Sequence, residues 1–151
     1  LIYNDTQTVD SKTINMDGSN STFSVSGNHT LTLDPGMLVR GRGDVTSGAI
    51  VSGTGQLNNN GTIRADINNQ NLTVNPSVLV NGATGIIEAI NGGDLSLIGP
   101  NTQNAGTISV EPRRELQHGG HRLIHTHRGD GQPHRQLGQR WRQLHVRYQH
   151  R

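Results

Sequence analysis

One short motif occurs three times in this chain at nearly equal spacing. Residues 61–65 (GTIRA), 85–89 (GIIEA) and 106–110 (GTISV) are copies of it, and each follows a turn rich in Asn, Gly and Thr. A period in the twenties is typical of a solenoid, in which one short unit cannot bury its apolar side alone and must stack on its neighbours. The repeat therefore predicts a stack of similar coils.

A second motif keeps the same period. Residues 71–74 (NLTV) recur one period later as 94–97 (DLSL), and we interpret 30–33 (TLTL) as a copy two periods upstream. Residues 78–80 (VLV) lie between these copies, and we match them with 37–39 (MLV). Each segment alternates apolar residues with small polar ones, the pattern of a strand with one buried face. We therefore predict three short strands per coil.

These patterns predict an all-β fold, a right-handed parallel β-helix (β-solenoid) fragment over residues 1–111, with about 20–24 residues per coil and the clearest repeats at 53–111. Such a stack suits a segment poor in aromatic residues, because narrow ladders of Ile, Val and Leu fill its core and backbone hydrogen bonds join its coils. Identical Asn residues that stack in register can add ladders of side-chain amides.

The composition changes abruptly after Glu111. Residues 1–111 carry a formal charge of −5, whereas residues 112–151 carry +7 and contain nine Arg, seven His and six Gln. We expect an irregular or disordered basic tail. When the codons are read one nucleotide later, a Gln codon before a C gives Asn or Ser, a His codon gives Thr or Ile, and an Arg codon gives Gly, Ala, Val or Asp, so the shifted frame permits the composition of the repeats. We interpret the tail as the product of a frameshift near residues 111–113 and not as an evolved domain.

The repeats resemble those of a known group of proteins. Residues 58–76 (NNNGTIRADINNQNLTVNP), 84–100 (TGIIEAINGGDLSLIGP) and 104–111 (NAGTISVE) are similar to repeats of large exported bacterial β-solenoid proteins, namely autotransporter passengers and filamentous-haemagglutinin-like adhesins. The resemblance implies a non-enzymatic surface or secreted scaffold, an adhesin-like stalk or passenger segment that presents a repetitive polar surface. It also implies an extracellular or outer-surface location, and glycans or host and neighbouring cell-surface molecules as partners.

An enzyme is the main alternative, since pectate-lyase-like carbohydrate-active enzymes use the same coil. In that case this fragment is the scaffold part of the enzyme, and the active site lies outside it. Asp44, Asp66 and Glu88 recur at equal intervals in the sequence, a spacing that could stack three carboxylates. Alignment of the repeats instead places Arg64 beside Glu88, which predicts a cross-coil ion pair at the surface. We therefore assign no catalytic, cofactor-binding or metal-binding residue, expect no cofactor and expect that the chain is not an enzyme.

The tail contains two patterns that can be read as binding sites. Four imidazoles have a spacing that could bind zinc, copper or nickel, namely His118, His121, His125 and His127. A His-rich stretch also produces such spacings by composition alone. Its nine Arg, with Trp141 and Tyr148 among them, could contact nucleic acid, but no fold motif presents these groups, so we expect no specific nucleic-acid partner.

The integrin-recognition tripeptide Arg-Gly-Asp occurs twice, at residues 42–44 and 128–130. It could contact a receptor, or it could simply form a solvated turn. The chain has no Cys and no apolar run long enough to span a membrane, so we expect no membrane span in this fragment. It begins at Leu1 inside a strand-like segment, from which we expect a longer parent chain.

The frameshift hypothesis predicts what the coding DNA contains. Downstream of the codons for residues 111–113, the alternate frame should be open and should encode further Gly/Asn/Thr-rich repeats of the same period. Sequencing the coding region tests this directly, and stop codons or a sequence without repeats in that frame would contradict it.

Overall fold

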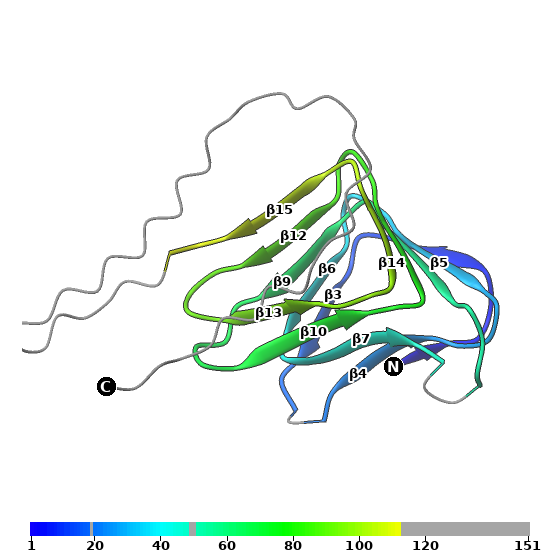
Figure 1. The fold of residues 1–151 in the computed structure, drawn as a ribbon, viewed down its shortest axis with the longest axis horizontal. Coiled ribbons are helices and arrows are strands. Elements are labelled where there is room, and N and C mark those ends of the chain that lie inside the picture. Colours follow the sequence, from blue (N-terminus) through cyan, green and yellow to red (C-terminus); the bar gives the residue numbers. More distant parts are fainter. Residues whose placement is uncertain (19, 49–50, 113–151) are drawn as a thin grey trace, which may run out of the picture. The chain divides into compact units, whose positions relative to one another are not determined.

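The computed structural model describes residues 1–18, 20–48 and 51–112, which form fifteen short β-strands and no helix (Figure 1). Within these residues, no helix is long and apolar enough to cross a membrane. The strands are β1 (Ile2–Tyr3), β2 (Gln7–Val9), β3 (Thr13–Met16), β4 (Thr22–Val25), β5 (Thr30–Leu33), β6 (Leu38–Gly41), β7 (Gly43–Ser47), β8 (Gln56–Asn59), β9 (Thr62–Ala65), β10 (Asn71–Asn75), β11 (Val78–Asn81), β12 (Ile86–Ala89), β13 (Asp94–Leu97), β14 (Asn101–Asn104) and β15 (Thr107–Val110).

Every third strand along the chain lies in the same sheet. Sheet A stacks β1, β4, β7, β10 and β13; sheet B stacks β2, β5, β8, β11 and β14; sheet C stacks β3, β6, β9, β12 and β15. Neighbouring strands in each sheet are parallel. Each coil thus gives one strand to each of three faces, as Figure 1 shows. The predicted parallel β-helix with three strands per coil is confirmed.

The repeated motif that begins with Gly lies in sheet C. Ile63 of β9 pairs with Ile87 of β12, and Ile87 pairs with Ile108 of β15, so the predicted shared column exists. Val39 continues the column below Ile63. Ile63 and Ile87 are fully buried, whereas Ile108 is 40% exposed, because no strand in the described part of the chain stacks on β15.

Two of the predicted equivalences are wrong. Residues 30–33 form β5 in sheet B, whereas residues 71–74 belong to β10 in sheet A; likewise 37–39 lead into β6 in sheet C, whereas 78–80 belong to β11 in sheet B. All three sheets alternate inward apolar with outward polar residues, so this local pattern does not reveal the sheet.

The coil length also varies along the stack. Thr73 of β10 pairs with Asp44 of β7 on one side and with Ser96 of β13 on the other. The coil that separates Asp44 from Thr73 is therefore several residues longer than the coil that separates Thr73 from Ser96. A search for copies at one fixed period cannot find both neighbours of β10.

The core is a narrow column of inward side chains from all three sheets. Its buried apolar members are Met16, Phe23, Val25, Leu31, Leu33, Met37, Val39, Val45, Leu57, Ile63, Ala65, Leu72, Val74, Leu79, Ile87 and Ala89. Burying one aliphatic side chain contributes roughly 1.5–3 kcal/mol. The single Phe lies at the N-terminal end, where its ring meets Tyr3 edge to face at 5.6 Å.

Sheet B contains an interior ladder of asparagines at the last position of three of its strands, β8, β11 and β14. The Asn59 Nδ2 group donates to Asn81 Oδ1 at 2.7 Å, and Asn81 Nδ2 donates to Asn104 Oδ1, also at 2.7 Å. Asn59 and Asn81 are fully buried. A primary amide can occupy every level of such a stack, since it donates to one neighbour and accepts from the other. The amide ladder expected for stacked Asn residues is therefore present.

Close contact between neighbouring coils, beside the ladder, explains why the sheet C motif begins with Gly. A Cβ atom on Gly85 would collide with the backbone oxygen of Asn59 and the side-chain oxygen of Asn81, and one on Gly106 would collide with the backbone oxygens of Gly82 and Gly85. Only a residue without a side chain lets the corner of one coil approach the corner below it so closely. The glycines thus permit the contact that the asparagines fill.

The ladder predicts a difference in stability between two matched variants. Asn81→Ala removes an acceptor and a donor from the middle of a buried stack, so we expect the free energy of unfolding to fall by about 2–4 kcal/mol. Asn104→Ala acts at the exposed end and should cost less than about 1 kcal/mol. Urea unfolding followed by circular dichroism measures both, and equal losses would show that the ladder is not a cooperative interior element.

Candidate functional site

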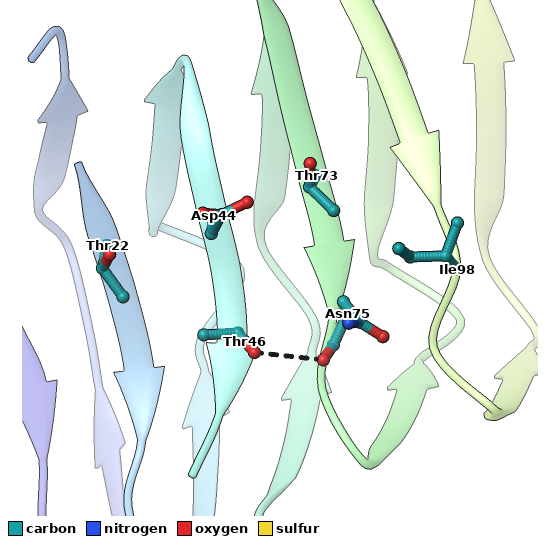
Figure 2. Close-up of a pocket in the computed structure, with 6 residues that line it drawn as sticks. All are labelled: Thr22, Asp44, Thr46, Thr73, Asn75 and Ile98. Carbon is teal, nitrogen blue, oxygen red and sulfur yellow. Dashed lines mark hydrogen bonds between the residues drawn. The ribbon is translucent and has the colours of Figure 1, made fainter. Parts of the chain in front are cut away.

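The outer face of sheet A contains a shallow hollow of about 460 Å³ (Figure 2). Six residues line it: Thr22 from β4, Asp44 and Thr46 from β7, Thr73 and Asn75 from β10, and Ile98, which directly follows β13. The lining thus comes from four successive coils. Segments far apart in the sequence meet here because the strands stack in register.

The register places the lining residues in two rows that run across the strands. Thr22, Asp44 and Thr73 are cross-strand partners in one row, and Thr46 pairs with Asn75 in the second. Ile98 extends the second row, since its N–H donates to the Val74 carbonyl oxygen at 3.1 Å. Neighbouring strands lie about 4.8 Å apart, so each row presents polar side chains at that interval.

The hollow combines hydrogen-bonding groups with one apolar surface. Asp44 and Asn75 are exposed, the three threonines are half-buried, and Ile98 is 53% exposed. Thr46 Oγ1 has two backbone acceptors within reach, the oxygen of Asn75 at 3.2 Å (Figure 2) and that of Ser47 at 3.4 Å. Hydroxyl, amide and carboxylate groups suit a ligand with many neutral hydroxyls, and an exposed aliphatic side chain can cover the apolar face of such a ligand.

The three equally spaced carboxylates do not stack on one another. Asp44 lies in the sheet A hollow, where it is the one carboxylate among the six lining residues, whereas Asp66 follows β9 and Glu88 lies in β12 of sheet C. Glycosidic cleavage ordinarily needs two carboxyl groups about 5–9.5 Å apart across the bond. The equal spacing in sequence therefore does not create an acid–base pair.

Asp66 and Glu88 are each bound to an arginine of the preceding coil. The predicted cross-coil pair is confirmed, because Arg64 Nε lies 2.6 Å from Glu88 Oε1. Arg40 Nη2 lies 2.6 Å from Asp66 Oδ2, a pair that sequence reasoning missed. The Asp66 side chain is only 2% exposed, and its Oδ1 atom has no hydrogen-bond partner within the described residues. Arg40 is thus the main compensation for a buried charge.

The first Arg-Gly-Asp tripeptide crosses the corner between sheets C and A. The Arg42 side chain donates to the backbone oxygen of Asp17 at 2.9 Å and to Gln70 Oε1 at 2.8 Å. Gly43 has a φ of 113°, and a Cβ atom there would collide with the Ser21 carbonyl. Arg42 and Gly43 therefore have structural roles, while Asp44 belongs to the hollow.

The four-histidine pattern, the Arg-rich segment with Trp141 and Tyr148, and the tripeptide at 128–130 lie outside the described residues. Within the described ranges, no group of three or more His, Asp or Glu side chains could hold a metal ion. His29 is half-buried near Gly27.

Sequence reasoning named Asp44 only as one of three spaced carboxylates and assigned it no role, and it missed the other members of the hollow, such as Thr22, Asn75 and Ile98. Alternation with apolar residues marks Thr22 and Asn75 as outward-facing, whereas Ile98 is itself apolar and directly follows Leu97, so the pattern does not distinguish it. The residues beside them on adjacent strands could not be identified from the sequence, because the coils differ in length. Comparison of the chain with family models, with curated proteins and with solved structures gives no significant match.

The two arginine pairs predict unequal costs on truncation. Arg40→Ala leaves the buried Asp66 carboxylate without its counter-ion, so we expect a loss of about 2–3 kcal/mol in unfolding free energy. The matched variant Arg64→Ala leaves Glu88, whose side chain is 18% exposed and can be solvated, so it should cost less than about 1 kcal/mol. Chemical denaturation of both variants measures the difference. A cost for Arg64→Ala equal to or above that for Arg40→Ala would contradict this account of Asp66.

Proposed function

We propose that this chain is a non-enzymatic surface or secreted scaffold, an adhesin-like stalk or passenger segment that binds glycans weakly through the sheet A hollow. The hollow is the observation that carries the proposal: its rows of hydroxyl, amide and carboxylate groups at strand spacing face solvent beside Ile98. We place the protein outside the cell or on a bacterial outer surface, by the resemblance of its repeats to those of exported β-solenoid proteins.

The shape of the hollow fits weak contact repeated many times. An open site formed by short side chains buries little of a ligand, so a single contact contributes little free energy. A long parent chain or a crowded surface would present many such sites to one polymer, and linked sites bind far more tightly than single ones. A stalk built from similar coils therefore gains avidity through repetition.

An extended saccharide chain is the partner that suits these rows best. Successive polar groups lie about 4.8 Å apart along a row, so several can contact one elongated ligand at once. Asp44 can accept two hydrogen bonds from sugar hydroxyls, and Asn75 can both donate and accept. The rival reading, the scaffold of a carbohydrate-active enzyme, gains no support from the placement of Asp44, Asp66 and Glu88.

A pair of isosteric variants tests the proposal. Thr73→Val removes one hydroxyl from the hollow and should weaken glycan binding about 3- to 10-fold, the equivalent of one hydrogen bond. Thr62→Val makes the same change on the outer face of sheet C, where Thr62 is similarly half-buried, and should leave binding unchanged. A glycan array with multivalent display of the full chain, followed by titration of the best ligand, measures both.

Two outcomes would contradict the proposal. Equal effects of Thr73→Val and Thr62→Val would show that sheet A is not the binding face. Release of cleaved products from the bound glycans would indicate an enzyme, so the supernatant of each binding assay is analysed for shortened saccharides.

A further inference from the structure

Three Asn-Gly dipeptides occur in the sequence, at residues 60–61, 81–82 and 91–92. An asparagine followed by glycine can modify itself without an enzyme, since the glycine carries no side chain to hinder its backbone nitrogen. That nitrogen attacks the side-chain carbonyl carbon of the asparagine. The reaction therefore needs an accessible amide, a free glycine N–H and a backbone that can rotate. The three sites differ strongly in these requirements.

The site at 81–82 is blocked at both reacting groups. Asn81 is fully buried, and its Nδ2 group donates to Asn104 Oδ1 and to the backbone oxygens of Gly85 and Thr107. The Gly82 N–H donates to the Asn59 carbonyl oxygen at 2.8 Å. Attack would require the ladder and the coil contact to open together.

The site at 60–61 is partly protected. Asn60 is half-buried, its side-chain oxygen lies directly against Gly82 of the next coil, and its N–H donates to the Leu33 carbonyl oxygen. Gly61 is buried, and its carbonyl oxygen accepts from the Ile86 N–H at 2.8 Å. The backbone on both sides of this bond is therefore held by neighbouring coils.

The site at 91–92 is open. Asn91 is exposed in the turn that connects β12 to β13, and within the described residues neither its side-chain amide nor the Gly92 N–H has a hydrogen-bond partner. Both residues have left-handed φ angles, 53° and 76°. The turn is held by the Gly93 N–H, which donates to the Ile90 carbonyl oxygen, and by two cross-coil bonds, from the Asn69 N–H to the Gly92 carbonyl oxygen and from the Asn91 N–H to Glu111 Oε2. None of these bonds uses the two reacting groups, the Asn91 side-chain amide and the Gly92 N–H. Rotation here disturbs far fewer contacts than at Asn81.

We propose that Asn91 is a site of spontaneous deamidation and isoaspartate formation in the folded protein. A bond forms between the Gly92 nitrogen and Asn91 Cγ, and the bond from Cγ to Nδ2 breaks. Ammonia leaves with the proton that Gly92 loses, and a cyclic succinimide remains. Water then opens the ring at either carbonyl and gives aspartate or isoaspartate, with no oxidation or reduction at any step.

The product alters the coil at a defined place. Isoaspartate adds one methylene to the main chain between β12 and β13, within a turn whose Gly92 carbonyl accepts from the Asn69 N–H at 2.9 Å. The new carboxylate also lies near Glu111, whose Oε2 atom accepts from the Asn91 N–H at 3.3 Å. The longer turn disturbs the entry to β13, and the like charge weakens the contact between this turn and Glu111, which follows β15. The modification thus acts on the coil that contributes Ile98 to the hollow.

Timed incubation of the full chain at mildly alkaline pH, followed by digestion and peptide mass spectrometry, tests the proposal. In the folded protein Asn91 should deamidate at least about tenfold faster than Asn81, a ratio that needs only about 1.4 kcal/mol of local opening free energy. Isoaspartate methyltransferase labelling should mark the same peptide. In concentrated urea the three sites should react at similar rates, because each is followed by glycine.

Asn91→Gln serves as the matched variant, since the longer side chain keeps the amide but disfavours the five-membered ring. It should remove the fast phase of ammonia release and leave the slower sites unchanged. The proposal is overturned if Asn81 reacts as fast as Asn91 in the folded chain, or if the ratio of their rates is the same with and without urea.

Discussion

The in-register stacking of parallel strands is the constraint on which the rest of this structure depends. Each residue lies directly over the residue one coil earlier, about 4.8 Å away, and backbone hydrogen bonds hold that alignment. Burial therefore depends on the neighbouring coils as much as on the residue itself. Ile87, covered on both sides, is fully buried, while the equivalent Ile108 is 40% exposed at the last described coil.

The same constraint decides which polar groups the interior can hold. An amide can repeat at every level because it both donates and accepts, whereas a column of carboxylates would repel itself. The ladder still has a cost where it stops: Asn59 lies over Leu33, and its Oδ1 atom is buried without a partner in the described part of the chain. Outside the core, opposite charges pair between neighbouring coils: Arg64 binds Glu88, and Arg40, whose cross-strand neighbour is Arg64, binds Asp66 instead.

Sequence reasoning succeeded where a repeated pattern is distinctive and failed where it is not. The motif of sheet C could be aligned because it begins with a glycine that close coil contact requires, and this alignment gave the Ile63–Ile87–Ile108 column and the Arg64–Glu88 pair. The alternation of Thr and Leu in β5 has no such distinguishing residue. Matching it with β10 is therefore wrong, since β5 lies in sheet B and β10 in sheet A. The connection from Ser47 to Gln56 lengthens one coil, which hid the neighbours of Asp44.

Inward and outward positions on one strand are under different physical constraints. An inward substitution must fit between two neighbours in a closed column, so inward residues fix the coil; an outward one meets solvent and can change with little cost. Sheet C uses this freedom for ion pairs at Arg40 and Arg64, and sheet A uses it for the hydroxyl and amide rows of the hollow. The chemistry of recognition in such a chain is therefore a property of one outer face, and the fold alone does not determine it.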